Sequence, residues 1–392
     1  MRDDSILIVA GEASGDEHAA GLIDEVKHLY PHSRLEWYGS GGERMARRGV
    51  DLMADVERLA AIGPAAALGN LASYWKLYRG LLQRARRRRP RLAVLVDFPE
   101  FNLLLARRLK KMAIPVCYFI SPQIWAWRSS RVRKVRRYVD RMLVILPFEE
   151  EFYRRHGVEA RYVGNPTAGR LGLQPASRPA EGQPPLVALL PGSRGKEVEH
   201  IFPLQLETAR QVVLQSAQRG LPRPRFRVAA APTVELEELR SRAREWVQRS
   251  GGEPLELEFI QEDIRTALAG VDFALVKSGT STLEAMILQV PFAMLYSMSL
   301  ASWLFGRLLV DTDTYCLANI VAGRRVVREF VQQQARPPLM ASHIVEHLAD
   351  PARGEALRQA LAQGARRLGE HDAYRQAARQ IGIWIDKEKE AA

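Results

Sequence analysis

The stretch Leu186–Leu190, Leu-Val-Ala-Leu-Leu, is followed directly by Pro191-Gly-Ser-Arg-Gly-Lys-Glu-Val-Glu-His200. The apolar run has the length and composition of a buried strand, which Pro191 and Gly192 end, and helical character begins near Lys196. A strand, a small-residue turn and a helix start leave backbone N–H groups free at the positive end of the helix dipole. Arg194 adds guanidinium donors suited to phosphate oxygens. The stretch therefore predicts either a phosphate site or an ordinary turn with a solvated arginine.

The bulk properties of the chain indicate a two-domain protein with an anionic partner. The 392 residues are 47% hydrophobic, which is enough for a core in each of two domains. The two cysteines, Cys117 and Cys316, show no metal-binding spacing and indicate a reducing compartment. With no signal-peptide pattern and no run of 18 apolar residues, we expect a cytoplasmic protein. The net charge of +12 favours nucleic acid, acidic lipid or phosphorylated substrates.

Short apolar runs alternate with helical segments along most of the chain. The expected strands are 5–10, 35–38, 92–96, 116–120, 142–146, one that ends near Tyr162, 186–190, 226–230, 255–260, 273–276 and 292–296. This alternation predicts doubly wound parallel sheets. The expected divisions are a domain at 1–166, a Pro- and Gly-rich linker at 167–185, a second domain at 186–340 and terminal helices at 341–392.

Polar residues follow several expected strands of the first half, at the edge where open α/β sheets bind ligands. The loop Gly11-Glu-Ala-Ser-Gly-Asp16 follows the first strand, and Asp16 either lines a site or caps the next helix. Asp97, in Asp97-Phe-Pro-Glu-Phe-Asn102, is either a general base or a helix cap. Gly39-Ser-Gly-Gly42 resembles a dinucleotide loop, but Arg44 replaces its third glycine, so no cofactor is predicted.

Two further segments of the first half combine aromatic and polar residues. In Ser121-Pro-Gln-Ile-Trp-Ala-Trp-Arg128 the tryptophans either contact a sugar or acyl chain or anchor the loop. Residues 62–90 place apolar and aromatic side chains at helical spacing beside an arginine cluster. That pattern fits either an interfacial helix on an anionic bilayer or a core-facing helix with a basic tail. The residues concerned include Leu68, Leu71, Trp75, Arg86 and Arg87.

The second half contains another strand–loop–helix pattern, Lys277-Ser-Gly-Thr-Ser-Thr-Leu-Glu284. Glu284 either accepts the ribose hydroxyls of a nucleotide or completes a helix capping box with Ser281. No metal is predicted. Glu197 replaces the metal-binding hydroxyl of a phosphate-binding Walker loop, and His343-Ile-Val-Glu-His347 has no evident third ligand.

Seven motifs, taken together and in order, resemble the lipid-A-disaccharide synthase family. They are Ala10-Gly-Glu-Ala-Ser-Gly-Asp16, Asp97-x-Pro-Glu-Phe-Asn102, Ser121-Pro-x-x-Trp-Ala-Trp-Arg128, Leu146-Pro-Phe-Glu149, Leu189-Leu-Pro-Gly-Ser-Arg-Gly-x-Glu-Val-Glu199, Ser278-Gly-Thr-x-x-Leu-Glu284 and Asn319-x-x-Ala-Gly323. The resemblance implies a GT-B fold, in which two Rossmann-like domains face a cleft. It also implies an inverting, metal-independent glycosyltransferase that joins UDP-2,3-diacylglucosamine to 2,3-diacylglucosamine 1-phosphate and releases UDP.

The resemblance also assigns roles to individual residues. Asp97 matches the family's general base, and Arg194 would hold the diphosphate. The donor pocket would be lined by Gly192, Ser193, Arg194, Gly195, Ser278, Gly279, Thr280, Glu284, Asn319 and Gln332. Acceptor-side residues would be Glu12, Ser14, Asp16 and Asn102. Because both substrates carry acyl chains, the resemblance favours the interfacial interpretation of residues 62–90 and peripheral contact with the cytoplasmic face of the inner membrane. The resemblance also implies a homodimer. We expect the terminal helices at 341–392 to pack back on the N-terminal domain of the same or the partner chain.

Two other classes of function stay open from the sequence. One is another UDP-sugar enzyme on the same fold, such as a UDP-N-acetylglucosamine epimerase or a peptidoglycan-type transferase. The other is a non-enzymatic basic protein that binds membrane or nucleic acid, although no recognisable nucleic-acid-binding motif is present.

Overall fold

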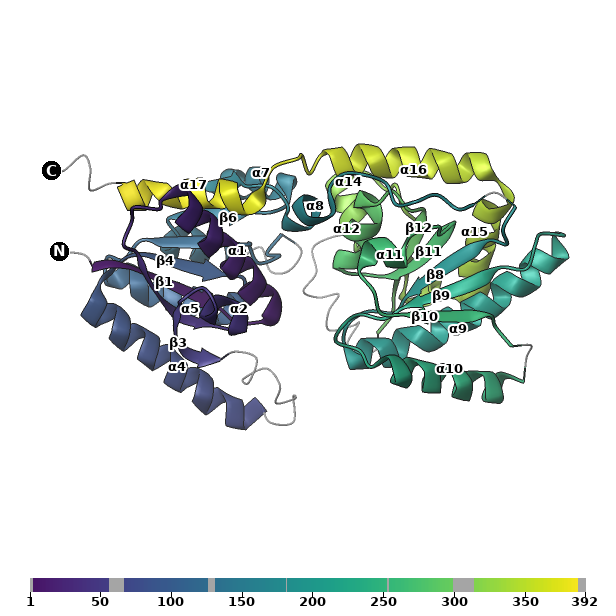
Figure 1. Ribbon diagram of the computed structural model, residues 1–392, viewed down its shortest axis with the longest axis horizontal. Helices are drawn as coiled ribbons and strands as arrows, with labels where there is room; N and C mark the ends of the chain where they lie inside the picture. Colours follow the sequence, from purple (N-terminus) through teal and green to yellow (C-terminus); the bar gives the residue numbers. More distant parts are fainter. Residues whose placement is uncertain are drawn as a thin grey trace. The chain divides into compact units, whose positions relative to one another are not determined.

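The computed structural model describes residues 3–55, 67–125, 131–180, 182–251, 254–298 and 314–386. The chain forms two compact units, and each is built around its own parallel sheet (Figure 1). Unit 1 comprises Met1–Pro166 and His371–Ala392, and unit 2 comprises Thr167–Glu370. The predicted α/β class with two doubly wound sheets is confirmed. Within the described chain, no helix is long and apolar enough to cross a membrane.

Unit 1 has a seven-stranded parallel sheet in the order β3-β2-β1-β4-β5-β6-β7. Its strands are β1 (Asp3–Ala10), β2 (Glu36–Gly41), β3 (Asp51–Asp55), β4 (Pro90–Val96), β5 (Val116–Phe119), β6 (Arg141–Val144) and β7 (Ala160–Tyr162). Its helices are α1 (Ala13–Leu29), α2 (Glu43–Ala46), α4 (Ala67–Arg88), α5 (Pro99–Lys111), α6 (Val132–Tyr138), α7 (Pro147–Arg155) and α17 (Ala373–Ile385).

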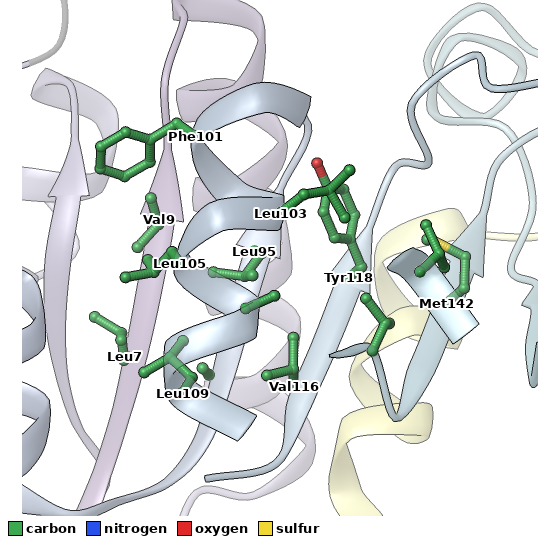
Figure 2. Packing of buried hydrophobic residues seen from close by; sticks show 14 of the residues in the cluster. Leu7, Val9, Leu95, Phe101, Leu103, Leu105, Leu109, Val116, Tyr118 and Met142 are labelled. Atoms are coloured by element: carbon green, nitrogen blue, oxygen red, sulfur yellow. The ribbon is translucent and has the colours of Figure 1, made fainter. Parts of the chain in front are cut away.

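Helices cover both faces of this sheet, so its central strands are apolar on both sides. All seven residues of β4 are buried. Proline at the first turn of α5 starts that helix, and Phe101, Leu105 and Leu109 recur along it at a spacing of four residues. Figure 2 shows these side chains packed with Val9 and Leu95 of the neighbouring strands β1 and β4. The core thus fixes where the carboxyl ends of β1 and β4 emerge.

Unit 2 repeats this design with a six-stranded parallel sheet in the order β10-β9-β8-β11-β12-β13. Its strands are β8 (Leu186–Leu190), β9 (Arg225–Ala229), β10 (Leu257–Ile260), β11 (Phe273–Lys277), β12 (Phe292–Tyr296) and β13 (Glu329–Val331). Its helices are α8 (Pro166–Leu171), α9 (Gly195–Gln218), α10 (Leu236–Ser250), α11 (Ile264–Ala267), α12 (Thr280–Ile287), α14 (Leu317–Ala322), the 3-10 turn η3 (Gln332–Gln334), α15 (Pro337–Ala349) and α16 (Pro351–Arg366).

Two features of the strands differ from the sequence prediction. The edge strands β3 and β13 are not among the expected strands, because both are short and neither is uniformly apolar. The glycines 39 and 41 lie inside β2 rather than in a loop. A Cβ atom at Gly39 would meet the backbone oxygen of Ile8 at 1.7 Å, so the missing side chain serves strand packing and not a dinucleotide.

The C-terminal helices also differ from the prediction that residues 341–392 pack back on the N-terminal domain. Only α17 does so. It packs on α1 through buried residues such as Ala377 and Ile381, and His18 Nδ1 lies 2.9 Å from Tyr374 Oη. By contrast, α15 packs on α9, and α16 packs on α12 and α14, all within unit 2.

Each sheet reverses its direction of winding between two central strands. The reversal lies between β1 and β4 in unit 1, and between β8 and β11 in unit 2. Open α/β sheets bind ligands outside the carboxyl ends of the strands at such a point. Pairing of Ala10 with Val96, and of Leu190 with Val276, brings the loops that follow these strands together within each unit.

Candidate functional site

At the carboxyl edge of unit 1, Asp97 follows β4 in a strained backbone conformation. Asp97 and Phe98 have φ angles of 46° and 52°, so two successive residues with side chains adopt the left-handed region. Such strain persists only where the surroundings hold it, and it concentrates at functional sites. Here the Asp97 carbonyl accepts hydrogen bonds from Tyr118 Oη and, at 2.7 Å, from Asn102 Nδ2. Gly11 lacks the Cβ atom that would strike the Phe98 ring.

The Asp97 carboxyl group has the properties of a proton acceptor at this edge. Burial, together with the negative charge of exposed Glu12, raises its pKa above the ordinary value, while the Phe98 amide opposes the rise. The residue at the cap position of α5 is Phe98, and no side chain caps that helix. The capping alternative for Asp97 is therefore wrong.

Two of the other predicted acceptor-side residues are structural. Asn102 is fully buried, and its Nδ2 also donates to the Val96 carbonyl at 3.2 Å, so it supports the backbone of Asp97. Asp16 is 1% exposed, and its carboxylate accepts from the backbone N–H groups of Gly42 (2.6 Å), Arg44 (3.0 Å) and Met45 (3.2 Å). It therefore caps α2 across the sheet edge. Ser14 lies exposed in the first turn of α1.

In unit 2, a pocket of about 460 Å³ lies at the point where the sheet reverses. It is lined by six of the predicted donor residues, namely Gly192, Ser193, Ser278, Gly279, Thr280 and Glu284. The loops after β8 and β11 supply the first four, and α12 supplies Thr280 and Glu284. Both loops lead directly into helices, α9 and α12. The pocket therefore combines two helix N-termini, which favour an anion.

The charged groups of this pocket include residues that the sequence prediction missed. Lys277, whose side chain is only 16% exposed, places Nζ 2.9 Å from Glu197 Oε2. Arg194 lies outside the lining, with a 75% exposed side chain and its Nη1 3.6 Å from Glu197 Oε1. Glu197 thus forms ion pairs with both cations. The sequence signal for Lys277 is its position at the end of a buried strand, just before Ser-Gly-Thr, where a side chain faces the ligand-binding edge of a sheet.

Glu284 lies on α12, facing the pocket, and does not form the predicted capping box. The cap residue of α12 is Gly279, and no side chain caps the helix. Instead Glu284 Oε1 accepts from Arg170 Nη2 at 2.9 Å. Burial raises the pKa of Glu284, and Arg170 opposes that rise. Arg170, from the expected linker, is a second pocket residue that the prediction missed.

The remaining predicted donor residues do not line this pocket. Gly195 begins α9, outside the lining. Asn319 uses all four of its hydrogen bonds on Val326, Val327 and Glu329, so it has none left for a ligand. Gln332 is bonded through its amide to the backbone N–H and carbonyl of Met298. Both residues hold backbone segments next to the pocket.

A second concave surface in unit 1 is apolar. A groove of about 720 Å³ runs between α4 and α5 and is lined by Ala72, Tyr74, Trp75, Tyr78, Phe101, Leu104, Arg107 and Arg108. Trp75 and Leu104 are 54% and 58% exposed. Arg86 and Arg87 are exposed near the end of α4, whereas the side chains of Leu68 and Leu71 lie outside the described part of the structure.

The fold and these loops define a class of protein, the GT-B fold of sugar-nucleotide enzymes. The chain is similar to the UDP-N-acetylglucosamine 2-epimerase of Neisseria meningitidis (TM-score 0.58, 10% identity, 97% of this chain and 100% of the other). It is also similar to MurG of Acinetobacter baumannii (TM-score 0.56, 13% identity, 97% and 99%).

Sequence comparison identifies the family within this class. The family model for lipid-A-disaccharide synthetase matches residues 6–381. The lipid-A-disaccharide synthases of Myxococcus xanthus and Koribacter versatilis are 40% and 37% identical, over 96% and 90% of each chain respectively. The chain belongs to the lipid-A-disaccharide synthetase family and is a glycosyltransferase.

The placement of Asp16 predicts a large effect on stability. Asp16→Ala leaves three backbone N–H groups without their acceptor and should lower the free energy of unfolding by about 3 kcal/mol. Asp24→Ala, on the same helix, removes only an exposed ion pair with Arg48 and should cost less than about 1 kcal/mol. Urea denaturation of both variants measures the difference. If the two variants were equally stable, Asp16 would have no structural role and could bind the acceptor substrate instead.

Proposed function

We propose that this enzyme joins UDP-2,3-diacylglucosamine to 2,3-diacylglucosamine 1-phosphate, giving the β-1,6-linked lipid A disaccharide 1-phosphate and UDP. Family membership supplies the reaction class. The observation that carries the mechanism is Asp97, a half-buried carboxylate of raised pKa on a strained backbone at the carboxyl edge of its sheet.

In the proposed reaction, Asp97 acts as the general base. The oxygen of the acceptor's 6-hydroxyl attacks the anomeric carbon of the donor, and its proton passes to the Asp97 carboxylate. The bond from that carbon to the diphosphate breaks, and UDP leaves with the electron pair. Because the oxygen attacks from the face opposite the diphosphate, the configuration at the anomeric carbon inverts. A raised pKa brings a carboxylate closer to the working pH and makes it a more effective base.

The loops of unit 2 supply what the leaving group needs. Amides of the Gly192–Gly195 turn and the positive end of α9 stabilise charge on the diphosphate. Arg194 and Lys277 release Glu197 and turn to the phosphates when the donor binds. Two cations and a helix terminus perform this role in the proposal, without a metal or other cofactor. Glu284 accepts the ribose hydroxyls in place of Arg170.

The acyl chains give the apolar groove between α4 and α5 a function. Exposed Trp75 and Leu104 would contact acyl chains or the bilayer, while nearby arginines meet anionic headgroups. This arrangement supports peripheral contact with the cytoplasmic face of the inner membrane. A homodimer rests on the family resemblance alone.

Replacement of the base tests the mechanism directly. Asp97→Asn should reduce turnover by about 10²- to 10⁴-fold because the amide cannot take the proton. Binding of UDP, measured by calorimetry, should stay close to that of the unmodified enzyme, because unit 2 supplies the UDP-binding loops. Mass spectrometry of the products verifies the disaccharide, and turnover of unacylated donor alone would contradict the proposed substrates.

The pH dependence provides a separate test of Asp97. The base acts in its ionised form, so kcat/KM should rise with pH through the raised pKa of Asp97. Glu12→Gln removes a negative charge that raises this pKa, so the acidic limb of the profile should move to lower pH. If the acidic limb of the profile does not move, Glu12 does not influence the pKa of Asp97.

The diphosphate site predicts a loss of UDP affinity. Arg194→Ala should weaken UDP binding by about tenfold, the effect of losing a charge-assisted hydrogen bond. Arg249→Ala, which removes an equally exposed arginine from α10, is the matched control and should bind UDP unchanged. Equal UDP affinities in the two variants would refute a role for Arg194.

The apolar groove predicts a loss of membrane binding. The double variant Trp75→Ser, Leu104→Ser should bind vesicles containing anionic phospholipid about tenfold more weakly, because two exposed apolar side chains are removed. Leu214→Ser, on α9 of unit 2, removes a leucine that is 47% exposed and serves as the control. Sedimentation with vesicles measures both, and equal binding would contradict the interfacial role of the groove.

A further inference from the structure

Glu149 is a buried carboxylate that ties two loops of unit 1 together. It lies in the first turn of α7, is 1% exposed, and its Oε2 accepts from the Leu146 N–H at 3.0 Å. Its Oε1 accepts from Ser121 Oγ at 2.7 Å and from Trp125 Nε1 at 3.1 Å. The first bond is local to α7. The other two reach the segment that follows β5.

Among the residues that the structure describes, the surroundings of Glu149 contain hydrogen-bond donors but no counter-charge. Tyr153 of α7 and Tyr162 at the end of β7 are its titratable neighbours, and burial keeps the pKa of each above its ordinary value. No cationic side chain of the described residues shifts Glu149, and burial raises its pKa to about 7. Capping α7 does not require a buried charge, because an exposed carboxylate could bond to Leu146 equally well. The free-energy cost of burying the Glu149 carboxylate is therefore explained by its hydrogen bonds to Ser121 and Trp125 and not by the capping of α7.

The segment held by Glu149 directly follows β5, a strand that lies beside Asp97. The strand β5 pairs with β4, which ends at Asp97, and Tyr118 of β5 donates to the Asp97 carbonyl. The chain then continues through Ser121 to Trp125, whose half-buried ring packs edge-on against Phe148 with centroids 5.0 Å apart. The carboxylate fixes the indole by its N–H, so the ring is held at a set orientation on the segment that follows the strand next to β4.

We propose that Glu149 is a positioning residue for the acceptor: by holding Ser121 and Trp125 it fixes an aromatic wall against which the acceptor sugar packs beside Asp97. This inference rests on the proposed function. It assigns Glu149 no contact with substrate and no proton transfer in the reaction.

Steady-state kinetics of three variants test the proposal. Trp125→Phe and Ser121→Ala each remove one donor to the carboxylate, and Glu149→Gln replaces a charged acceptor by an amide that cannot accept on both sides. Each should raise KM for the acceptor by about tenfold, the cost of one broken buried hydrogen bond, with KM for the donor unchanged. Trp384→Phe on α17 and Ser33→Ala before β2 are matched controls outside the site.

A spectroscopic titration separates positioning from a purely structural role. Protonation of Glu149 weakens the bond that its carboxylate receives from the Trp125 indole, so tryptophan emission should change with a midpoint near pH 7. The step should persist in Trp384→Phe and disappear in Trp125→Phe and Glu149→Gln.

The outcomes are distinct. A raised acceptor KM together with loss of the fluorescence step supports the proposal. An unchanged acceptor KM in all three variants overturns it, even where they are less stable. Failure of the unmodified enzyme to form any disaccharide would instead overturn the proposed function. The two failures can be told apart because the fluorescence titration requires no substrate.

Discussion

The register of two pairs of parallel strands determines the chemistry of this protein. Pairing of β1 with β4 places Glu12 beside Asp97, and pairing of β8 with β11 places the Gly192 turn beside Ser278. A parallel strand pair that slipped by one residue would turn its side chains to the opposite face. Core packing on both faces of each sheet prevents this, so burial of aliphatic side chains sets the geometry of polar groups that never touch the core.

Many polar groups near the two ligand-binding edges serve the backbone rather than a substrate. Asp16, Asn102 and Asn319 are buried, and each bonds to main-chain groups of another segment. An irregular loop at a sheet edge exposes N–H and C=O groups that the sheet cannot satisfy, and buried side chains supply the missing partners. Fewer of the polar side chains at these edges are available to bond to a ligand, and those are charged: Asp97, Glu284 and Lys277.

The sequence predicts the strands and the loops that follow them well, because apolar runs bounded by glycine and proline carry that information locally. The strand Leu186–Leu190 and the polar loop after it are found where they were expected. The partner of each polar side chain depends on contacts between distant segments. Asp16 is a helix cap, which is one of its two predicted roles, but it caps α2 instead of its own helix. The sequence does not indicate the ion pair of Lys277 with Glu197, because the two residues lie far apart along the chain.

Unit 1 is assembled from two separate stretches of chain, with all of unit 2 between them. The apolar face of α1 that includes Ile23 belongs to the same buried cluster as Ile381 of α17. On the ribosome, α1 emerges long before α17, so this face stays uncovered while unit 2 is being synthesised. The domain that is translated first therefore completes its folding last, and the nascent chain must be kept from aggregating through that apolar face until α17 arrives.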